Sequence, residues 1–503
     1  MKKYSADPNM ILPKLWVARI PQIWDKIIDE DSLPKDSTSK FSQYFNDEKE
    51  KAAVKKMEDS INTEDSVIKE DMIPKNTVIG SCLGTYYVTV ESDDEEVVAL
   101  SDDEEVVALS DDEENTPVVK PVVLSPETVS NKNDINILAL AYDKEADAWN
   151  KIDDAEVKED NYVWGSLSES APVIVFTVRK DTVLLEENDL FGGPTFVGNG
   201  VPIVVSTKED GSIVVTDARG KETPITNSTV IIAGSVDGSD LESTSVTVIG
   251  TTLNNVVKGG SYSKEKENVR VKDIKVFVKD STLNGGLSGS GFNTKVDNLS
   301  FKIQNSKIDF MGAGESWLQS IKKDCNTKDN IGFGSKAYCK KCTMEIENSN
   351  ISLLFLSGNS GYLYVDDTEC TINGGSYGYI ITGGSNGRTN NAKLVANDFK
   401  SQYFQTTNRG VVNHATAKLN NCTIDKFFVA GDSTDKTVNG TVDKVDIDIT
   451  GGKIGLYAGT QGGKTLTTEQ AKEIINTLKI SRSTEVEYKE NSDKILADNI
   501  RIK

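Results

Sequence analysis

Cysteine is the residue type in this 503-residue sequence whose spacing most resembles a metal site. Cys339 and Cys342 are separated by two lysines, with Cys325 before them and Cys370 after them, an arrangement that could form a zinc quartet. Such sites usually combine two CxxC pairs, and only one is present. Cys370 and Cys422 each precede Thr-Ile, in the repeat position that serine holds elsewhere (Ser306 and Ser349). We therefore interpret the cysteines as stacked core residues, with zinc and a disulfide as the alternatives.

Acidic clusters are the second candidate for chemistry, because glycoside cleavage needs two carboxylates at a fixed separation on one face. Asp366, Asp367 and Glu369 form the densest cluster of the second half, and Asp398 and Asp425 could lie on neighbouring repeats. The chain carries 78 acidic residues, so such clusters arise by chance and a solvated surface is the favoured interpretation.

Other catalytic groups have little support in the sequence. Arg388 and Arg409 could serve as the base of a lyase, and His414, the single histidine, has no evident partner. P-loop and Rossmann fingerprints are absent from the sequence. We predict no catalytic residue, no metal ligand and no cofactor.

The charge balance limits the classes of partner. Lys and Arg number 56 against 78 acids, a net charge of −22, which argues against nucleic acid and anionic membranes. No apolar window approaches the length of a transmembrane helix, which predicts no membrane insertion. The first residues lack the apolar core of a Sec signal peptide.

Composition predicts five segments. They are an N-terminal anchoring arm (1–80), an acidic repeat linker (81–129), a small β-rich domain (130–224), a β-helix (225–463) and a C-terminal helical cap (464–503). Within the β-rich domain, Glu-Asp-Gly at 209–211 between two β-branched runs predicts a hairpin.

The arm contains an apolar stretch at residues 9–28, with side chains at steps of three and four interrupted by Pro13 and Pro21. It predicts short helical turns that form either a local core or a docking segment, since Trp and Ile are frequent interface anchors. The candidate anchor residues are Leu12, Leu15, Trp16, Ile20, Ile23, Trp24 and Ile27.

The linker contains an exact nine-residue duplication, residues 92–100 and 101–109, and the start of a third copy. Residues 91–114 hold thirteen acids and no base, so a packed element there would repel itself. We predict an extended or disordered spacer. A calcium loop is the alternative, although the glycine turn of an EF-hand is missing.

From residue 225 an Asn/Asp-Ser/Cys-x-Ile/Leu phrase recurs between short strands, mostly 21 to 29 residues apart. The gap of 43 residues between Asn305 and Asn348 implies one insertion. Such periods without intervening helices predict a right-handed parallel β-helix, whose stacked turns share one core. Asn at the corners tolerates a left-handed backbone. The rival is an antiparallel β-sandwich. Thr467 to Gln470 resembles a capping box before a helix over 471–478 that could cover the last turn.

The layout of an apolar arm, a linker, a small β domain and a β-helix resembles a tailed-phage fibre or spike, most closely the head-fibre or tail-fibre proteins of crAss-like phages. The resemblance covers residues 227–463 and the arm around Trp16 and Trp24. It implies a structural virion protein, made in the bacterial cytoplasm, that is a homotrimer anchored by its N-terminus to a capsid or tail protein. The distal part would contact the host surface, with a surface glycan as the expected ligand.

A trimer would also bury aromatic side chains along one flank of the coils, and we expect six to project there: Phe355, Tyr362, Tyr377, Tyr379, Tyr403 and Phe404. Two other classes remain open, a glycan-degrading tailspike (hydrolase or lyase) and a bacterial surface adhesin. A concave row of acids and aromatics along one face would favour the tailspike.

Overall fold

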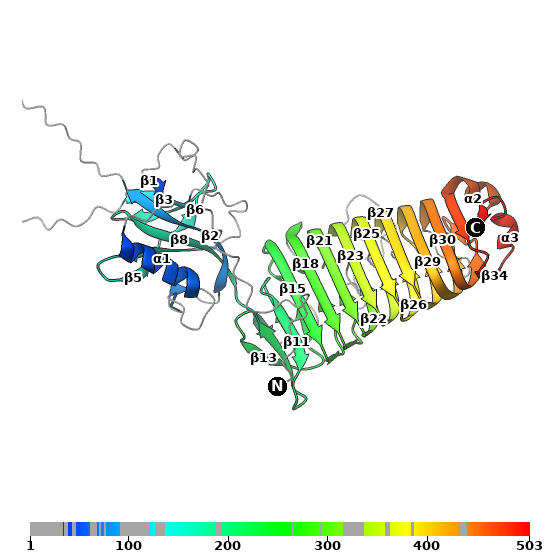
Figure 1. Ribbon diagram of the computed structural model, residues 1–503, viewed down its shortest axis with the longest axis horizontal. Helices are drawn as coiled ribbons and strands as arrows, with labels where there is room; N and C mark the ends of the chain where they lie inside the picture. The colour runs from blue at the N-terminus through cyan, green and yellow to red at the C-terminus, as the bar shows by residue number, and fades with distance from the viewer. Residues whose placement is uncertain are drawn as a thin grey trace, which may run out of the picture. The chain divides into compact units, whose positions relative to one another are not determined.

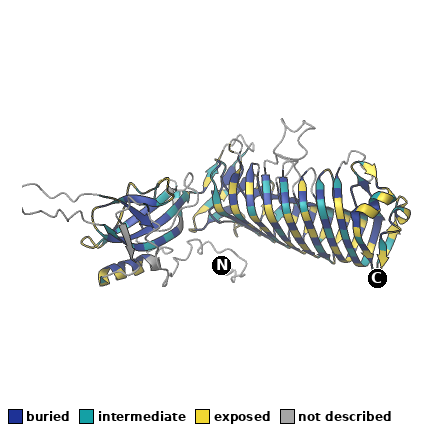
Figure 2. Cartoon of the chain, turned by 90° about the horizontal axis from the view of Figure 1, so that it is seen from above, coloured by how far each residue is buried: buried dark blue, intermediate teal, exposed yellow. Residues whose placement is uncertain are grey.

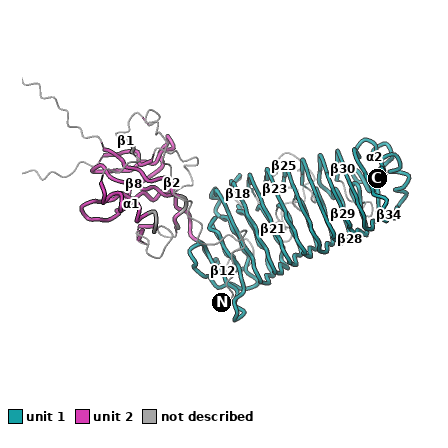
Figure 3. Tube along the Cα trace, in the orientation of Figure 1, with its two compact units in different colours: residues 1–13, 182–503 teal, residues 14–181 magenta. Residues whose placement is uncertain are grey.

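The computed structural model describes residues 34, 39–42, 47–60, 68–69, 72–74, 77–90, 120–125, 136–186, 193–263, 266, 268–291, 293–314, 337–357, 363–383, 387–432 and 440–503. These residues belong to two compact units, one within residues 14–181 and the other within 182–503 (Figure 3). The predicted anchor at 9–28 and the acidic repeat at 92–114 lie outside the described residues.

The N-terminal unit has a central antiparallel sheet with a core on each face. The strand order is β1 (Ser39–Ser42), β2 (Thr77–Val90), β8 (Ala171–Lys180), β4 (Asn136–Asp143) and β5 (Ala148–Lys151). Alternation places Phe176 toward helix α1 (Glu48–Ser60) and Val175 toward the second sheet. That sheet has the order β3 (Lys120–Ser125), β7 (Val163–Leu167) and β6 (Glu156–Val157).

Two predicted domain boundaries differ from this arrangement. Residues 77–90 form β2, which pairs with β8, so the segment expected to begin a linker at 81 is strand up to Val90. The β-rich domain expected at 130–224 divides after residue 181, because the later strands join the β-helix. Local β-branched patterns could not distinguish these partners, since β-branched strands occur in both units.

Residues 182–503 form a parallel β-helix of about 9 turns, which we call rungs (Figure 1). The long strands stack in one sheet, the long face: β15 (Leu241–Ile249), β18 (Val269–Lys279), β21 (Thr294–Gln304), β23 (Ala337–Glu347), β25 (Leu363–Asn373), β27 (Arg388–Asn397), and the first parts of β29 (Val411–Phe428) and β30 (Thr441–Tyr457). The short strands stack in a second sheet, the short flank: β16 (Thr252–Leu253), β19 (Thr282–Leu283), β22 (Lys307–Gly312), β24 (Asn350–Phe355), β26 (Ser376–Ile381), β28 (Lys400–Gln405), and the ends of β29 and β30.

A third and shorter ladder comprises β10 (Thr195–Val197), β14 (Val230–Ile232), β17 (Val257–Lys258) and β20 (Leu287–Ser288). Alternating buried and exposed positions run along the long strands (Figure 2), and the inward rows of all rungs join into one core. The predicted parallel β-helix is confirmed, because the rungs pair in parallel where a sandwich would need antiparallel pairs.

Stacking begins earlier than the predicted residue 225. Strand β10 already pairs in parallel with β14, and β11 (Ile203–Thr207) with β15. The hairpin expected at residues 209–211 is confirmed, and joins β11 to β12 (Ile213–Asp217), which pairs with β13 (Glu222–Ile225). Strand β9 (Val183–Leu185) pairs antiparallel with β10.

One corner of each rung carries a residue in the left-handed region, as the recurring Asn/Asp phrase predicted. Its φ values lie between 44° and 76°, at Gly250, Asp280, Asn305, Asn348, Gly374, Asp398, Asn421 and Gly451. The corner amides also bond along the stack: Asn421 Nδ2 donates to Asp398 Oδ1 over 2.7 Å. Asn and Gly recur because they tolerate this backbone at low cost.

The insertion predicted between Asn305 and Asn348 adds no rung. Strand β21 pairs directly with β23, and β22 with β24, so the additional residues leave the stack between them. Most of that segment, 315–336, lies outside the described residues.

The C-terminal residues continue the stack and cover its end. Thr467 forms the predicted capping box with Gln470, but helix α2 (Thr468–Ile474) is shorter than predicted. The residues after it form β33 (Ile475–Ile480), which pairs with β30 and buries Ile475, Leu478 and Ile480. The last elements are β34 (Glu485–Tyr488), α3 (Ser492–Ile495) and β35 (Ile500–Ile502).

Candidate functional site

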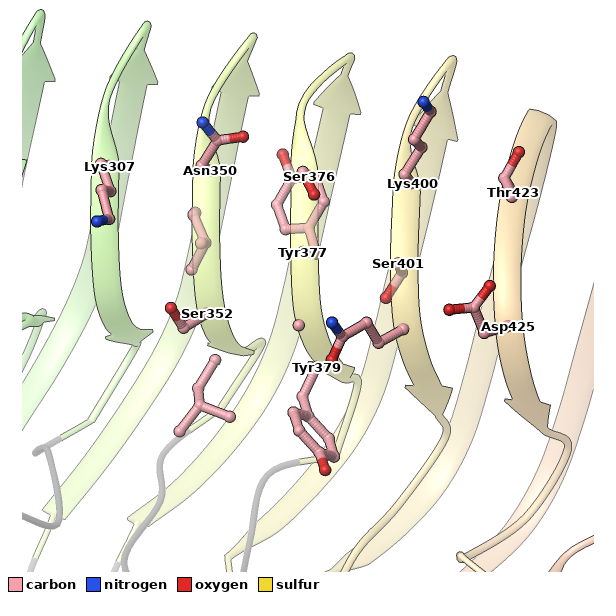
Figure 4. A pocket seen from close by; sticks show the side chains of 14 residues that line it. Lys307, Asn350, Ser352, Ser376, Tyr377, Tyr379, Lys400, Ser401, Thr423 and Asp425 are labelled. Atoms are coloured by element: carbon pink, nitrogen blue, oxygen red, sulfur yellow. The ribbon is translucent and has the colours of Figure 1, made fainter.

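A groove lies on the outer surface of the short flank, with a volume of about 530 Å³ (Figure 4). It crosses five consecutive rungs, β22, β24, β26, β28 and β29, which at about 4.8 Å per rung corresponds to about 19 Å along the stack. We call it the flank groove. Its lining residues are Lys307, Asn350, Ile351, Ser352, Leu353, Ser376, Tyr377, Gly378, Tyr379, Lys400, Ser401, Gln402, Thr423 and Asp425.

The parallel register arranges these side chains in rows along the stack. The first outward row contains Lys307, Asn350, Ser376, Lys400 and Thr423, each opposite the next in the ladder. The neighbouring row points inward, where Ile351 and Tyr377 are buried in the core. Alternation therefore gives the groove a polar rim above an apolar interior.

Ser352, Gly378 and Gln402 form a second outward row, in which Gly378 contributes no side chain between its two neighbours. A Cβ added there would lie 2.4 Å from the backbone oxygen of Ser352. The close approach of the two rungs therefore requires glycine, and the missing side chain leaves the floor of the groove open between its neighbours.

Tyr379 forms the opposite rim, where Figure 4 shows it below the outward rows, and Tyr403 lies opposite it on the next rung. Their rings stack at 4.3 Å and 7°. Lys426 Nζ donates to the Tyr403 hydroxyl over 2.9 Å, a hydrogen bond that raises the lysine pKa. Burial, together with Tyr403, raises the pKa of Tyr379. Because the two rings stack on each other, the tyrosines offer edges and hydroxyls more than open ring faces.

Three charged side chains line the flank groove without an ion-pair partner among the described residues. Among the described residues, Lys307, Lys400 and Asp425 form no ion pair or side-chain hydrogen bond. They are the groups available to a charged or strongly polar ligand.

The densest acidic cluster of the sequence, Asp366, Asp367 and Glu369, lies on the long face, outside the flank groove. Asp366 accepts from the Tyr338 hydroxyl and from Asn390 Nδ2 at 2.8 Å. Asp367 accepts from Asn391 at 2.8 Å, and Glu369 pairs with Lys393 at 3.4 Å. Each carboxylate therefore binds a neighbour on an adjacent rung.

The remaining candidates are distributed over the coils. Asp398 occupies a corner, and Asp425 alone lines the flank groove. The Arg388 guanidinium lies 5.8 Å from the ring centre of Tyr364, and Arg409 is exposed before β29. His414 does have a partner, since its Nε2 lies 2.7 Å from Asp446 Oδ2.

A second hollow, of about 370 Å³, lies on the long face. Its lining includes Asp367, Glu369, Asn391, Lys393 and His414, whose side chains form the cross-rung pairs just described. Its charged groups are mostly already satisfied, in contrast to those of the flank groove.

Four cysteines of the coils are buried free thiols, as predicted: Cys339, Cys342, Cys370 and Cys422. Burial raises the pKa of Cys339 and of Cys422 to about 12. Cys422 follows the corner residue, as Ser306 and Ser349 do, but Cys370 lies within β25 opposite Met344. The predicted equivalence therefore holds for Cys422 and is wrong for Cys370. Among the described residues no cluster of His, Cys, Asp or Glu could hold a metal, and Cys325 lies outside them.

The expected aromatic flank is largely interior. Phe355, Tyr377 and Phe404 are buried within the chain itself, so the prediction that they project outward is wrong. Tyr379 and Tyr403 are half-buried, and Tyr362 lies outside the described residues. The expectation failed because inward and outward residues alternate along a strand, and only the register between neighbouring rungs shows which is which.

The sequence reasoning also missed Gly378, Gln402, Lys307 and Lys400. Aligning the chain by the corner residues places Asn350, Ser376, Lys400 and Thr423 two residues after their corners, which could have identified the row. No helix in the described part of the chain is long and apolar enough to cross a membrane. Comparison with protein-family models, curated proteins and solved structures gives no match.

Proposed function

We propose that the β-helix binds an extended glycan along the flank groove, and that the chain is a structural virion protein, a trimeric phage head or tail fibre. The observation that carries the proposal is a polar groove crossing five rungs, about 19 Å at the usual strand spacing. A groove of this length suits a chain-like ligand better than a compact metabolite.

Other chain-like ligands fit less well. The strands beneath the groove are paired on both sides, so no free edge invites a peptide to add a strand. Nucleic acid needs basic tracks and open aromatic faces, whereas this chain has a net charge of −22 and the ring of Tyr379 at the groove is stacked on Tyr403. Hydroxyl and amide side chains such as Ser352, Ser376 and Gln402 suit the many hydroxyls of a sugar chain.

Binding is favoured over cleavage. A glycosidase needs two carboxylates facing the same substrate, and in the described part of the chain Asp425 is the one acidic residue that lines the groove. The acidic cluster of the sequence lies on the other sheet and pairs with neighbouring side chains.

The virion assignment rests on the sequence layout and on compatibility with the fold. In this proposal, the β-helix projects the groove toward a host, and residues 9–28 anchor the protein to a capsid or tail protein. Three arms per trimer would strengthen attachment through effective concentration. The trimer contact is not assigned to an apolar flank, because three of the expected aromatics are buried in each chain.

The groove is tested with a double variant, Ser352→Ile and Gln402→Ile, which removes two hydrogen-bonding side chains and narrows the floor. Both positions are exposed strand sites where a β-branched residue is tolerated. The matched control is Thr371→Ile with Lys418→Ile, at exposed sites of the long face. We expect the affinity for immobilised bacterial surface polysaccharides to fall about tenfold or more for the groove variant, and to stay unchanged for the control. Equal binding by both variants would overturn the groove assignment.

Anchoring is tested by deleting residues 1–30. We expect a trimer that is lost from particles. If the shortened protein assembles onto particles at the wild-type copy number, the anchor is elsewhere, and a monomer by mass measurement of the full chain would refute the trimer.

A further inference from the structure

Two lysines in the first outward row differ from the lysine that follows them. Lys307 and Lys400 lie three rungs apart, about 14 Å at the usual strand spacing, and line the flank groove. Lys453 continues the same row two rungs beyond Lys400, outside the groove, and pairs with Glu485 at 2.6 Å. The row therefore has an ion-paired lysine outside the groove, and two lysines along the groove that form no ion pair among the described residues.

From this contrast we infer that the flank groove selects glycans that carry carboxylate groups, such as uronic acids, with Lys307 and Lys400 as the selecting residues. This inference rests on the proposed glycan-binding function. Ammonium groups bind carboxylates through charge-assisted hydrogen bonds, which are stronger than those to neutral hydroxyls. Because the lysines are far apart along the stack, both can contact a single extended acidic chain.

The overall charge of −22 does not oppose such selection at physiological salt. Screening limits the interaction between exposed charges to about 8 Å, so a bound glycan responds mainly to the groove's own groups. Asp425 is in the adjacent outward row, at one end of the groove, where its carboxylate can accept from sugar hydroxyls. The two lysines and Asp425 would thus contact different parts of the ligand.

The experiment measures binding of the full chain to pairs of oligosaccharides, each pair comprising a uronic-acid member and its carboxyl-reduced counterpart. The variants are Lys307→Glu, Lys400→Glu and the double variant. Lys418→Glu, an exposed long-face site on β29, is the matched control. Exposed substitutions of this kind should leave the melting temperature nearly unchanged, which verifies folding.

We expect the acidic members to bind wild-type protein at least about tenfold more tightly than their reduced counterparts. Each single variant should weaken acidic binding about tenfold, and the double variant about 100-fold, since distant sites act additively. The Lys418→Glu control should bind like wild type, and acidic binding should weaken as salt increases.

Other results separate the two levels of the proposal. The acidic selectivity is overturned, while glycan binding stands, if the carboxyl-reduced oligosaccharides bind as tightly as the acidic ones. The same holds if Lys418→Glu lowers the affinity for acidic oligosaccharides as much as Lys400→Glu does. If no oligosaccharide binds, both are overturned.

Discussion

The long face and the short flank of the β-helix are built from the same rungs but treat their outward side chains differently. On the long face, outward groups pair across rungs: Asn390 with Asp366, Lys393 with Glu369 and His414 with Asp446. On the short flank, the groove side chains of Lys307 and Asp425 have no such partner among the described residues. The difference indicates that stacking places groups in register, while the residue types within each row decide whether they bind each other or a ligand.

The interiors beneath the two surfaces also differ. Under the short flank the core contains large side chains, with the rings of Phe404 and Phe427 stacked at 4.7 Å. Under the long face the rows include smaller ones, such as Cys342, Ala392 and Ala415. A larger share of the packing energy per residue is thus expected beneath the groove.

Removing a large core side chain tests this expectation and should give the largest effect. Phe404→Ala should destabilise the β-helix by about 3–5 kcal/mol, because it removes a fully buried ring and leaves a cavity. Cys370→Ala, beneath the long face, should cost about 1 kcal/mol, since one sulfur is lost. Denaturant midpoints measure both, and equal shifts would contradict the proposed asymmetry of the core.

Removing one carboxylate from the long face and one from the flank groove tests whether the cross-rung hydrogen bonds of the long face contribute to stability. Asp366→Ala removes the acceptor of the Tyr338 hydroxyl and one of the two acceptors of the Asn390 amide, so we expect a loss of about 1–2 kcal/mol. Asp425→Ala removes no hydrogen bond among the described residues and should change stability by less than about 0.5 kcal/mol. Thermal unfolding compares the two, and a larger loss for Asp425→Ala would reverse the comparison.

The pH dependence of stability provides another test of the paired carboxylates on the long face. Burial raises the pKa of Asp446, but hydrogen bonds from His414, Thr477 and Asn476 outweigh it and hold that pKa below 3.8. The stabilisation that ionised Asp446 contributes is therefore complete well above the pKa of this carboxyl in the unfolded state. It is lost as the pH falls through the lower pKa of Asp446 in the folded state.

Below about pH 4, we expect the Asp446→Asn variant to lose less stability than the wild type does. The difference should be less than about 1 kcal/mol. Melting curves at neutral and acid pH measure it, with Asp425→Asn as the control. An unchanged acid dependence would show that Asp446 does not contribute.

Breaking a surface ion pair should give the smallest effect. Lys393 and Glu369 are both about half exposed, at 53% and 52%. Lys393→Ala should therefore cost no more than about 0.5 kcal/mol, as is usual for exposed pairs. Lys400→Ala provides the unpaired control, and a loss above about 1 kcal/mol for Lys393→Ala would indicate a more cooperative long face than these contacts suggest.

Several features of the coils could be predicted because they depend on local chemistry. Asn305, Asn348 and Asn421 were identified as corner residues, since few residue types accept a left-handed backbone. Cys422 was correctly placed beside its corner, but the same reasoning failed for Cys370 within a strand. Tyr377 and Phe404 were assigned to the outer surface although they belong to the core, because a shift of one residue in register exchanges the two faces of a strand.

The sequence by itself determined the parallel β-helix, its corners and its capping box, because short-range preferences and a repeat of constant length encode them. Only the tertiary structure decided where the stack begins and which side chains share a row. The flank groove is the main example: Lys307, Ser352, Gly378 and Lys400 are far apart in the chain, and only the stacking of successive rungs brings them onto one surface. The physical reason is that hydrogen bonds between rungs fix the register, and register is a property of pairs of strands that no single strand encodes.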